Sequence, residues 1–112
     1  MSRDDETLLD ILRAGRLAIE FVGNVDEAAF VGDLKTQSAV LHQLMLLGEA
    51  AKRVSETFRS AHPEIPWRLA AGMRDRLIHH YDDVDLVEVW KTVRRDVPEL
   101  IAALEPLVPR GE

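Results

Sequence analysis

Side chains capable of chemistry are concentrated in one stretch, RDRLIHHY at residues 74–81. Arg74 supplies a permanent cation, whose planar guanidinium can hold a phosphate through two parallel hydrogen bonds. His79 supplies an imidazole that gains and loses a proton near neutral pH, so it can act as a general acid or base. Tyr81 adds a phenol two residues later. The spacing therefore indicates an anion-binding group beside a proton-transfer group.

Arg74 also has a purely structural interpretation. At about 100° per residue it falls within an apolar helical arc. The arc consists of Trp67, Ala70, Leu77, Ile78 and Tyr81. A guanidinium there needs a partner, because desolvating an unpaired charge is costly. That partner is an anionic ligand, a second chain or a carboxylate such as Glu49, Asp82 or Asp83, and an ion pair is the more common solution.

The histidines and the tyrosine have ordinary interpretations too. His79 suits a helix C-terminus, where the helix dipole favours imidazolium. A tyrosine on an apolar arc, such as Tyr81, is more often a core residue than a catalytic one. His79 and His80 are adjacent, whereas helical two-histidine metal sites use residues i and i+4. We therefore expect no metal site, and we expect His42 and His62 at the surface or in a loop.

Four amphipathic helical segments must position this stretch. Their apolar residues recur at spacings of three and four, which is typical of helices that bury one face. The segments cover residues 4–22, 33–59, 66–80 and 85–105, and the second is expected to be the longest. No convincing strand is present. Because the connections are short, the sequence predicts an all-α, antiparallel bundle of four main helices.

Several residues mark where these helices begin, bend and end. Asp33 and Asp85 are candidate N-caps, and Pro66 can occupy a first helical turn. One extra turn of helix is expected at residues 26–30, with Phe30 tucked into the core. Pro98 removes a backbone donor, so the last helix should be kinked or interrupted at Val97.

The length and the composition of the chain limit the possible classes of function. A length of 112 residues suits a single domain, residues 1–112, and the absence of cysteine fits a cytoplasmic protein. No signal peptide and no apolar run of about 20 residues is present, so no membrane segment is expected. The chain also lacks a glycine-rich phosphate loop, a nucleophile elbow and a His-Glu-x-x-His motif. Most nucleotide hydrolases, esterases and metalloproteases are thereby excluded.

Taken together, these motifs resemble a known family. The pattern of arginine, four residues, histidine, one residue and tyrosine at positions 74–81 is similar to that of HEPN domains of the HepT toxin type. Three flanking blocks also match the family's pattern in order. These are Gly48-Glu49-Ala50-Ala51, His62-Pro63-Glu64-Ile65-Pro66-Trp67 and Gly72-Met73. The resemblance extends over nearly the whole chain.

The resemblance implies an all-α homodimer that acts as a metal-independent endoribonuclease, the toxin of a type II toxin–antitoxin module. Arg74 and His79 become the catalytic pair, and Asp75 becomes a supporting residue. The implied partners are an RNA substrate, such as a tRNA or an mRNA, and a cognate nucleotidyltransferase antitoxin. That antitoxin would silence the toxin by adding AMP to Tyr81. No cofactor is implied.

The residues fit this chemistry only in part. Cleavage through the 2′-hydroxyl needs a base, an acid and a cation for the developing negative charge. One chain offers a single His79, whereas a twofold dimer offers two. On a continuous helix His79 lies about 140° from Arg74, so either the helix unwinds near His80 or a second chain completes the site.

The net charge of −6 is the main difficulty, because gripping a long RNA requires basic surface. Arginines that could cluster on one side are Arg53, Arg59, Arg68, Arg74, Arg76, Arg94 and Arg95. The alternative function is a non-catalytic helical partner subunit of a nucleotidyltransferase. The presence of both Arg74 and His79 favours the ribonuclease, because a scaffold would not require that pair.

Overall fold

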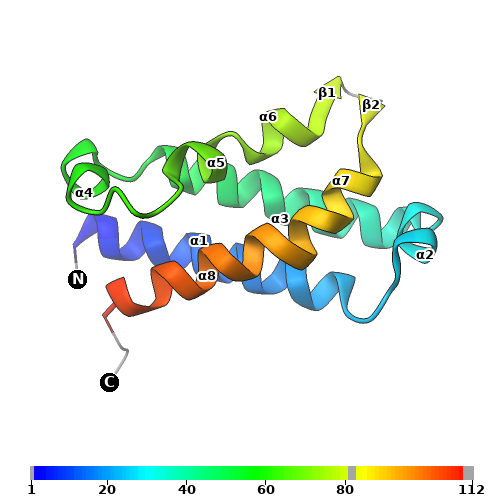
Figure 1. The fold of residues 1–112 in the computed structure, drawn as a ribbon, viewed down its shortest axis with the longest axis horizontal. Coiled ribbons are helices and arrows are strands. Elements are labelled where there is room, and N and C mark those ends of the chain that lie inside the picture. Colours follow the sequence, from blue (N-terminus) through cyan, green and yellow to red (C-terminus); the bar gives the residue numbers. More distant parts are fainter. Residues whose placement is uncertain (1, 81–82, 110–112) are drawn as a thin grey trace.

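Helices build most of the protein in its computed structural model (Figure 1), which describes residues 2–80 and 83–109, except for the side chains at positions 74 and 78–80. The elements in chain order are α1 (Arg3–Val22), α2 (Glu27–Val31), α3 (Leu34–Lys52), α4 (Glu56–Ala61), α5 (Trp67–Ala71), α6 (Met73–Leu77), β1 (Ile78–His80), β2 (Asp83–Val84), α7 (Leu86–Lys91), a π-helical segment (Thr92–Asp96), α8 (Val97–Leu104) and a 3-10 turn (Glu105–Leu107). The predicted all-α class is confirmed. No helix of the described chain is long and apolar enough to cross a membrane.

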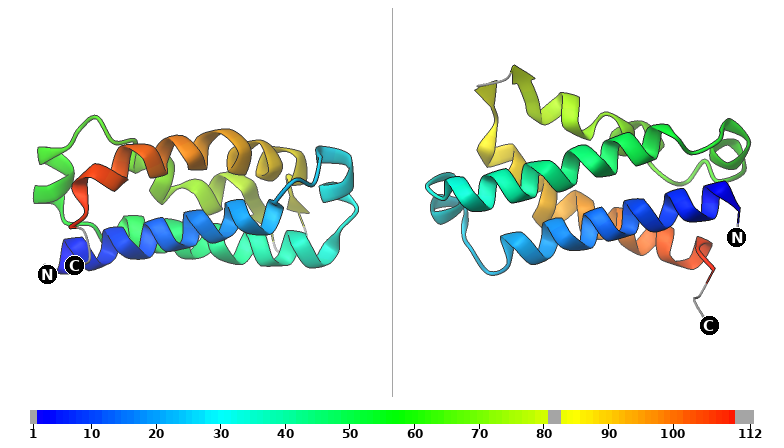
Figure 2. Two further views of the ribbon diagram at one scale, coloured as in Figure 1. Left: turned by 90° about the horizontal axis from the view of Figure 1, so that it is seen from below. Right: turned by 180° about the vertical axis from the view of Figure 1, so that it is seen from behind.

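The helices form a bundle around one core. α1 and α3 run antiparallel, side by side, as the two long helices (Figures 1 and 2). α8 packs against α1, whereas α5 and α6 pack against α3. The short α2 contacts α7 at one end of the bundle. The predicted four-part bundle with one extra short helix is therefore confirmed, although its third part is broken into several pieces.

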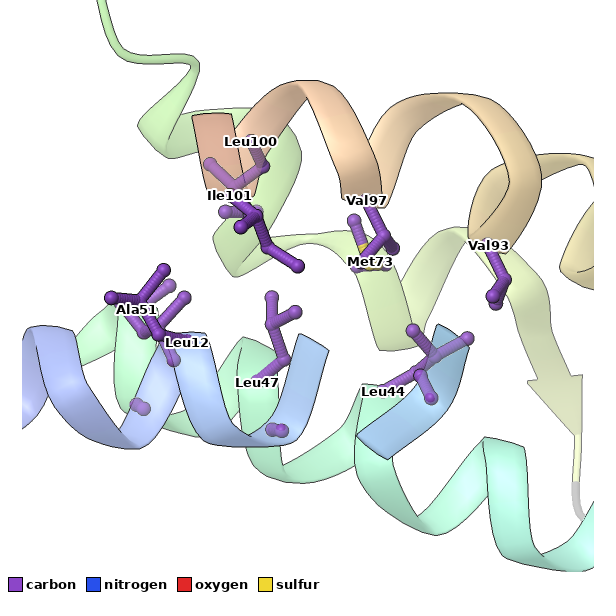
Figure 3. Close-up of a cluster of buried hydrophobic side chains, with 14 of the residues drawn as sticks. Leu12, Leu44, Leu47, Ala51, Met73, Val93, Val97, Leu100 and Ile101 are labelled. Atoms are coloured by element: carbon purple, nitrogen blue, oxygen red, sulfur yellow. The ribbon is translucent and has the colours of Figure 1, made fainter. Parts of the chain in front are cut away.

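The core lies where these parts face one another. Figure 3 shows aliphatic side chains from α1, α3, α6 and α8 converging on a common interior. They include Leu12, Leu44, Leu47, Met73, Val97 and Ile101. Each such burial stabilises the fold by about 1.5–3 kcal/mol relative to exposure. Phe30 is fully buried, as predicted, and it anchors the connection between α1 and α3.

Local capping explains where two helices begin. Asp33 accepts a hydrogen bond from the Thr36 amide at 3.1 Å, and Asp85 accepts one from the Glu88 amide at 3.1 Å. Both predicted N-caps are thus confirmed. The Thr36 hydroxyl also donates to Asp33, and these two bonds lower the pKa of that carboxyl. Such caps accept hydrogen bonds from the first backbone amides of a helix, which have no acceptor within the helix itself.

The length predicted for the second helix is wrong. It was expected to continue to Arg59, but α3 ends at Lys52 and a separate α4 begins at Glu56. Ser55 explains the break, because its amide and its hydroxyl donate to the two carboxylate oxygens of Asp4, at 2.9 and 2.6 Å. Consequently α1, with 20 residues, is longer than α3, with 19.

The predicted interruption before Pro98 is confirmed and takes a specific form. The backbone between α7 and α8 is π-helical over Thr92–Asp96, and the Val97 amide donates to the Thr92 carbonyl. A π-helical turn closes hydrogen bonds one residue later than an α-turn. Pro98 then lies in the first turn of α8, where its missing N–H costs little.

Candidate functional site

The RDRLIHHY stretch spans a change from helix to strand. The backbone of Arg74 lies in α6, and that of His79 lies in β1. The side chains of both residues lie outside the described part of the structure, as does Tyr81 altogether. Their assignment as catalytic pair and modification site therefore stays a prediction, and so does an ion pair of Arg74 with Asp82.

The third helix was predicted to reach His80, and this is wrong. α5 and α6 are separated at Gly72, and α6 ends at Leu77. The following residues pair with β2 as an antiparallel hairpin, in which Ile78 lies opposite Val84, and the Asp85 amide donates to the Leu77 carbonyl at 3.1 Å. The absence of strands was thus also predicted wrongly.

This hairpin changes the relation between positions 74 and 79. The separation of about 140° holds only while both residues share one continuous α-helix. Because the backbone becomes extended from Ile78, His79 is released from that constraint. Of the two alternatives considered from sequence, the main chain adopts the one in which the helix ends, and it ends three residues earlier than proposed.

The core holds α6 in place. Met73 and Leu77, the first and last residues of α6, are each 1% exposed. Met73 points into the cluster that contains Leu44 and Val97 (Figure 3). Between these anchors, Asp75 and Arg76 are exposed. The short helix that carries Arg74 is therefore fixed at both ends by buried side chains.

A polar contact fixes the same helix from the side. Arg76 Nη2 donates to the buried Thr92 hydroxyl and to Asp96 Oδ2, each at 3.2 Å. Both acceptors belong to the π-helical segment. Sequence analysis assigned Arg76 no individual role, because its partners lie 16 and 20 residues further along the chain.

Asp75, the predicted supporting residue, lies at the edge of an open hollow of about 650 Å³. Its carboxylate is 4.0 Å from Lys52 Nζ, which is also 3.8 Å from Glu49 Oε1. Glu49, one candidate partner for Arg74, thus has a cation from its own helix nearby. The hollow itself was not predicted, because it forms where α3, α4, α5 and α6 meet.

The remaining candidate residues have structural positions. His42 is exposed, and His62 follows α4 with its ring 4.5 Å from that of Phe58. Trp67 is a core residue, as predicted, whereas Trp90 is half-buried and its indole N–H donates to a backbone carbonyl. Among the side chains that the structure describes, which exclude those of His79 and His80, no group of three His, Cys, Asp or Glu residues is arranged to hold a metal ion.

Several known proteins are similar to this chain in sequence. The sequence model of the family described as Ribonuclease HepT-like matches residues 11–107. A protein of Thermococcus cleftensis named "Probable ribonuclease HepT" is 46% identical over 100 residues, which cover 89% of this chain and 91% of that protein. One from Methanocaldococcus jannaschii named "Putative RNase MJ1380" is 35% identical over 98 residues, covering 88% and 90%. One from Caldanaerobacter subterraneus subsp. tengcongensis named "Putative RNase TTE0752" is 38% identical over 90 residues, covering 80% of each. No solved structure shows significant similarity.

Proposed function

The chain belongs to the HepT-like ribonuclease family, and we propose that it is a metal-independent endoribonuclease that acts as the toxin of a type II toxin–antitoxin module. The observation that carries this proposal is the family match over residues 11–107, which includes the whole RDRLIHHY stretch. The resemblance expected from that stretch is thereby confirmed at the level of the family.

In the proposed reaction the RNA supplies its own nucleophile. A His79 imidazole removes the proton of a 2′-hydroxyl, whose oxygen attacks the adjacent phosphorus. Arg74 stabilises the negative charge that develops on the phosphorane oxygens. A second, protonated His79 donates to the leaving 5′-oxygen as the P–O bond breaks. The products are a 2′,3′-cyclic phosphate and a 5′-hydroxyl end.

This reaction needs two histidines, so the proposed active unit is a homodimer. Its two RDRLIHHY stretches would face each other and form one composite cleft, with Asp75 orienting the groups around Arg74. Two features of the described backbone suit a fixed catalytic site on each chain of such a dimer. The helix that carries Arg74 is anchored firmly in the core, and the chain leaves helical geometry before His79. A rigid scaffold of this kind preserves catalytic geometry.

Control of the toxin is proposed to act on Tyr81. A cognate nucleotidyltransferase, the antitoxin, would transfer AMP to the phenol oxygen and release pyrophosphate from ATP. The added phosphate would bring bulk and negative charge close to Arg74 in sequence. It would repel the RNA backbone and compete for the guanidinium, which is a local electrostatic way of silencing the enzyme. The module would act in the cytoplasm, where tRNA and mRNA are accessible.

Growth after induced expression tests the proposal. The wild type is expected to arrest growth, whereas Arg74→Ala and His79→Ala are expected to be harmless. Arg95→Ala and His42→Ala are matched controls, because each removes the same residue type from an exposed position elsewhere, and both should remain toxic. If the two site variants fold normally and still arrest growth, the catalytic assignment is wrong, and a non-catalytic partner of the nucleotidyltransferase becomes the better description.

A further inference from the structure

The hollow next to Asp75 is lined by more cations than carboxylates. Its lining residues come from the end of α3, from α4 and α5, and from the start of α6. Three cations, Lys52, Arg59 and Arg68, line it together with two carboxylates, Glu56 and Asp75. A local excess of positive charge on a chain of net charge −6 is an exception that calls for an explanation.

The two arginines of the hollow differ from the other described arginines that the sequence offered as a possible basic surface. In the described part of the chain neither Arg59 nor Arg68 forms an ion pair with a carboxylate. The other described candidates for a basic surface each lie close to a carboxylate or donate to a backbone carbonyl. These are Arg53, Arg76, Arg94 and Arg95. The hollow therefore concentrates guanidinium groups that are available to a ligand.

Arg59 gives the strongest indication. Its Nε atom is buried and has no hydrogen-bond partner within the described residues. A buried donor without a partner costs about 1–3 kcal/mol, so such atoms are rare unless a ligand or a water satisfies them. The Asp4–Ser55 contact is the cause of this position. It separates α3 from α4, and α4 then carries Arg59 to the wall of the hollow.

Lys52 is less firmly engaged than its two nearby carboxylates suggest. The distances of 3.8 Å to Glu49 and 4.0 Å to Asp75 exceed hydrogen-bonding range, and its side chain is half exposed. Exposed ion pairs of this kind contribute roughly 0–1 kcal/mol. A phosphate that receives charge-assisted hydrogen bonds can displace such contacts.

We propose that this hollow binds a backbone phosphate of the RNA next to the one that is cleaved. The inference rests on the proposed ribonuclease function and extends it. Asp75 lines the hollow and directly follows Arg74 in α6, so the backbone that carries Arg74 lies beside the hollow. In the proposed complex the strand that Arg74 binds continues from there into the hollow. Arg59 and Arg68 hold the phosphate, with Lys52 adding charge, while Glu56 repels anions and confines the phosphate to the arginine side.

This subsite resolves the conflict between an acidic protein and an RNA substrate. Binding one flanking phosphate needs only a few cations, whereas binding a long stretch of RNA backbone needs an extended basic surface. The salt dependence of binding should accordingly be shallow, since each neutralised phosphate of a single strand contributes about 0.7 to the slope of log K against log salt. An acidic remainder of the surface then limits nonspecific association with nucleic acids.

Binding of an uncleavable RNA tests the subsite independently of catalysis. The probe is a fluorescent ten-nucleotide 2′-O-methyl RNA, titrated with dimeric protein at several salt concentrations. Arg59→Gln and Arg68→Gln are each expected to weaken binding about tenfold, the loss typical of one charge-assisted hydrogen-bonding group. The two substitutions together should lower the salt slope by about 0.7, the contribution of the one phosphate that both arginines hold. Arg13→Gln, the same charge change at an exposed position of α1, should bind like the wild type.

Cleavage kinetics separate this proposal from the function on which it rests. With a ten-nucleotide RNA the two variants should raise KM and leave kcat unchanged, and with a dinucleotide, which is too short to reach the hollow, they should match the wild type. If the wild type cleaves RNA and both variants bind and cleave the long substrate like Arg13→Gln, the subsite is wrong while the ribonuclease stands. If the wild type binds RNA through Arg59 and Arg68 but cleaves none, the subsite stands and the ribonuclease is wrong.

Two further results would overturn the subsite. Arg68 is exposed, so Arg68→Gln should fold even where Arg59→Gln does not, and normal RNA binding by folded Arg68→Gln counts against the proposal. If Arg68→Gln weakens binding to the nucleotidyltransferase and leaves RNA binding unchanged, the hollow is a protein interface instead.

Discussion

Arg76 Nη2 lies 3.2 Å from Asp96 Oδ2 and thereby connects α6 to the π-helical segment that precedes α8. The Asp96 side chain is 19% exposed, so this ion pair is better shielded from solvent than the others described on the surface. A π-helical turn aims its side chains differently from an α-turn, and such turns are frequent at functional sites. Here it presents Thr92 and Asp96 to the helix that carries Arg74.

Removal of this contact should loosen α6. Arg76→Ala is expected to lower the free energy of unfolding by about 1 kcal/mol, because it breaks a partly shielded ion pair and a hydrogen bond to Thr92. Urea unfolding measures the change. Arg95→Ala is the matched control, since Arg95 also faces Asp96 but is 64% exposed, and its effect should be within about 0.5 kcal/mol. Additive effects of Arg76→Ala and Asp96→Ala in a double-mutant cycle would contradict this coupling.

The Asp4–Ser55 contact predicts a dependence of stability on pH. Hydrogen bonds from the Ser55 hydroxyl and amide lower the pKa of Asp4 below its ordinary value. A lowered pKa means that the stabilisation is complete above the unfolded-state pKa, about 4, and is lost as the pH falls through the folded-state value. Thermal unfolding should show Asp4→Ala less stable than the wild type at pH 7, with the difference shrinking below about pH 4. A difference that persists unchanged to pH 2 would exclude the carboxylate as its origin.

Ser55 should also stabilise the start of α4, because its hydroxyl accepts a hydrogen bond from the Phe58 amide at 3.1 Å. Ser55→Ala removes an N-cap and the hydroxyl bond to Asp4 while the amide bond remains, so the free energy of unfolding should fall by about 1–2 kcal/mol. Ser2→Ala removes a cap at the exposed start of α1 and serves as the comparison, with a smaller expected effect. Equal losses in the two variants, measured by denaturant unfolding, would show that the long-range bond contributes nothing.

Product analysis tests the proposed chemistry. Cleavage in the presence of EDTA should proceed at the rate found without it, and the fragments should carry 2′,3′-cyclic phosphate and 5′-hydroxyl ends. His79→Ala should reduce the rate by about 100-fold or more, the usual contribution of a general acid or base. Mass spectrometry of the fragments identifies the ends. A 5′-phosphate product, or activity abolished by EDTA, would contradict the mechanism.

Modification of Tyr81 makes a separate prediction. Tyr81→Phe retains the ring but lacks the oxygen that would accept AMP, so co-expression of the nucleotidyltransferase should no longer rescue growth. Incubation with labelled ATP should label the wild type and leave the variant unlabelled. The variant must first be shown to arrest growth by itself, which separates lost control from lost toxicity. Normal silencing of a toxic Tyr81→Phe would mean that the antitoxin acts by another route.

Features with local causes were predictable from sequence. Asp33 and Asp85 begin helices because their carboxylates reach amides three residues away, and those contacts require no distant partner. Phe30 is buried because the large apolar residue of a short amphipathic turn is stabilised by facing the core rather than water. The interruption before Pro98 follows from the covalent structure of proline. The family resemblance likewise rested on residue types and spacings within a short stretch.

Other features were decided by contacts between distant parts of the chain. Helical periodicity continued through Ser55, and only Asp4, 51 residues away, shows why the helix ends there. The early end of the helix at Leu77 has a nearer cause, since pairing with β2, a few residues further on, replaces the last turn predicted for the helix.

The sequence by itself determined the all-α class, the family and the identity of the residues proposed for catalysis, because composition, periodicity and motif are properties of the chain alone. Only the tertiary structure decided which arginines are paired and which share the hollow beside Asp75. The physical reason is that charge pairing depends on distances in space. Asp10 lies far from Arg53 in sequence, and Asp96 lies far from Arg76, although each pair meets in the fold.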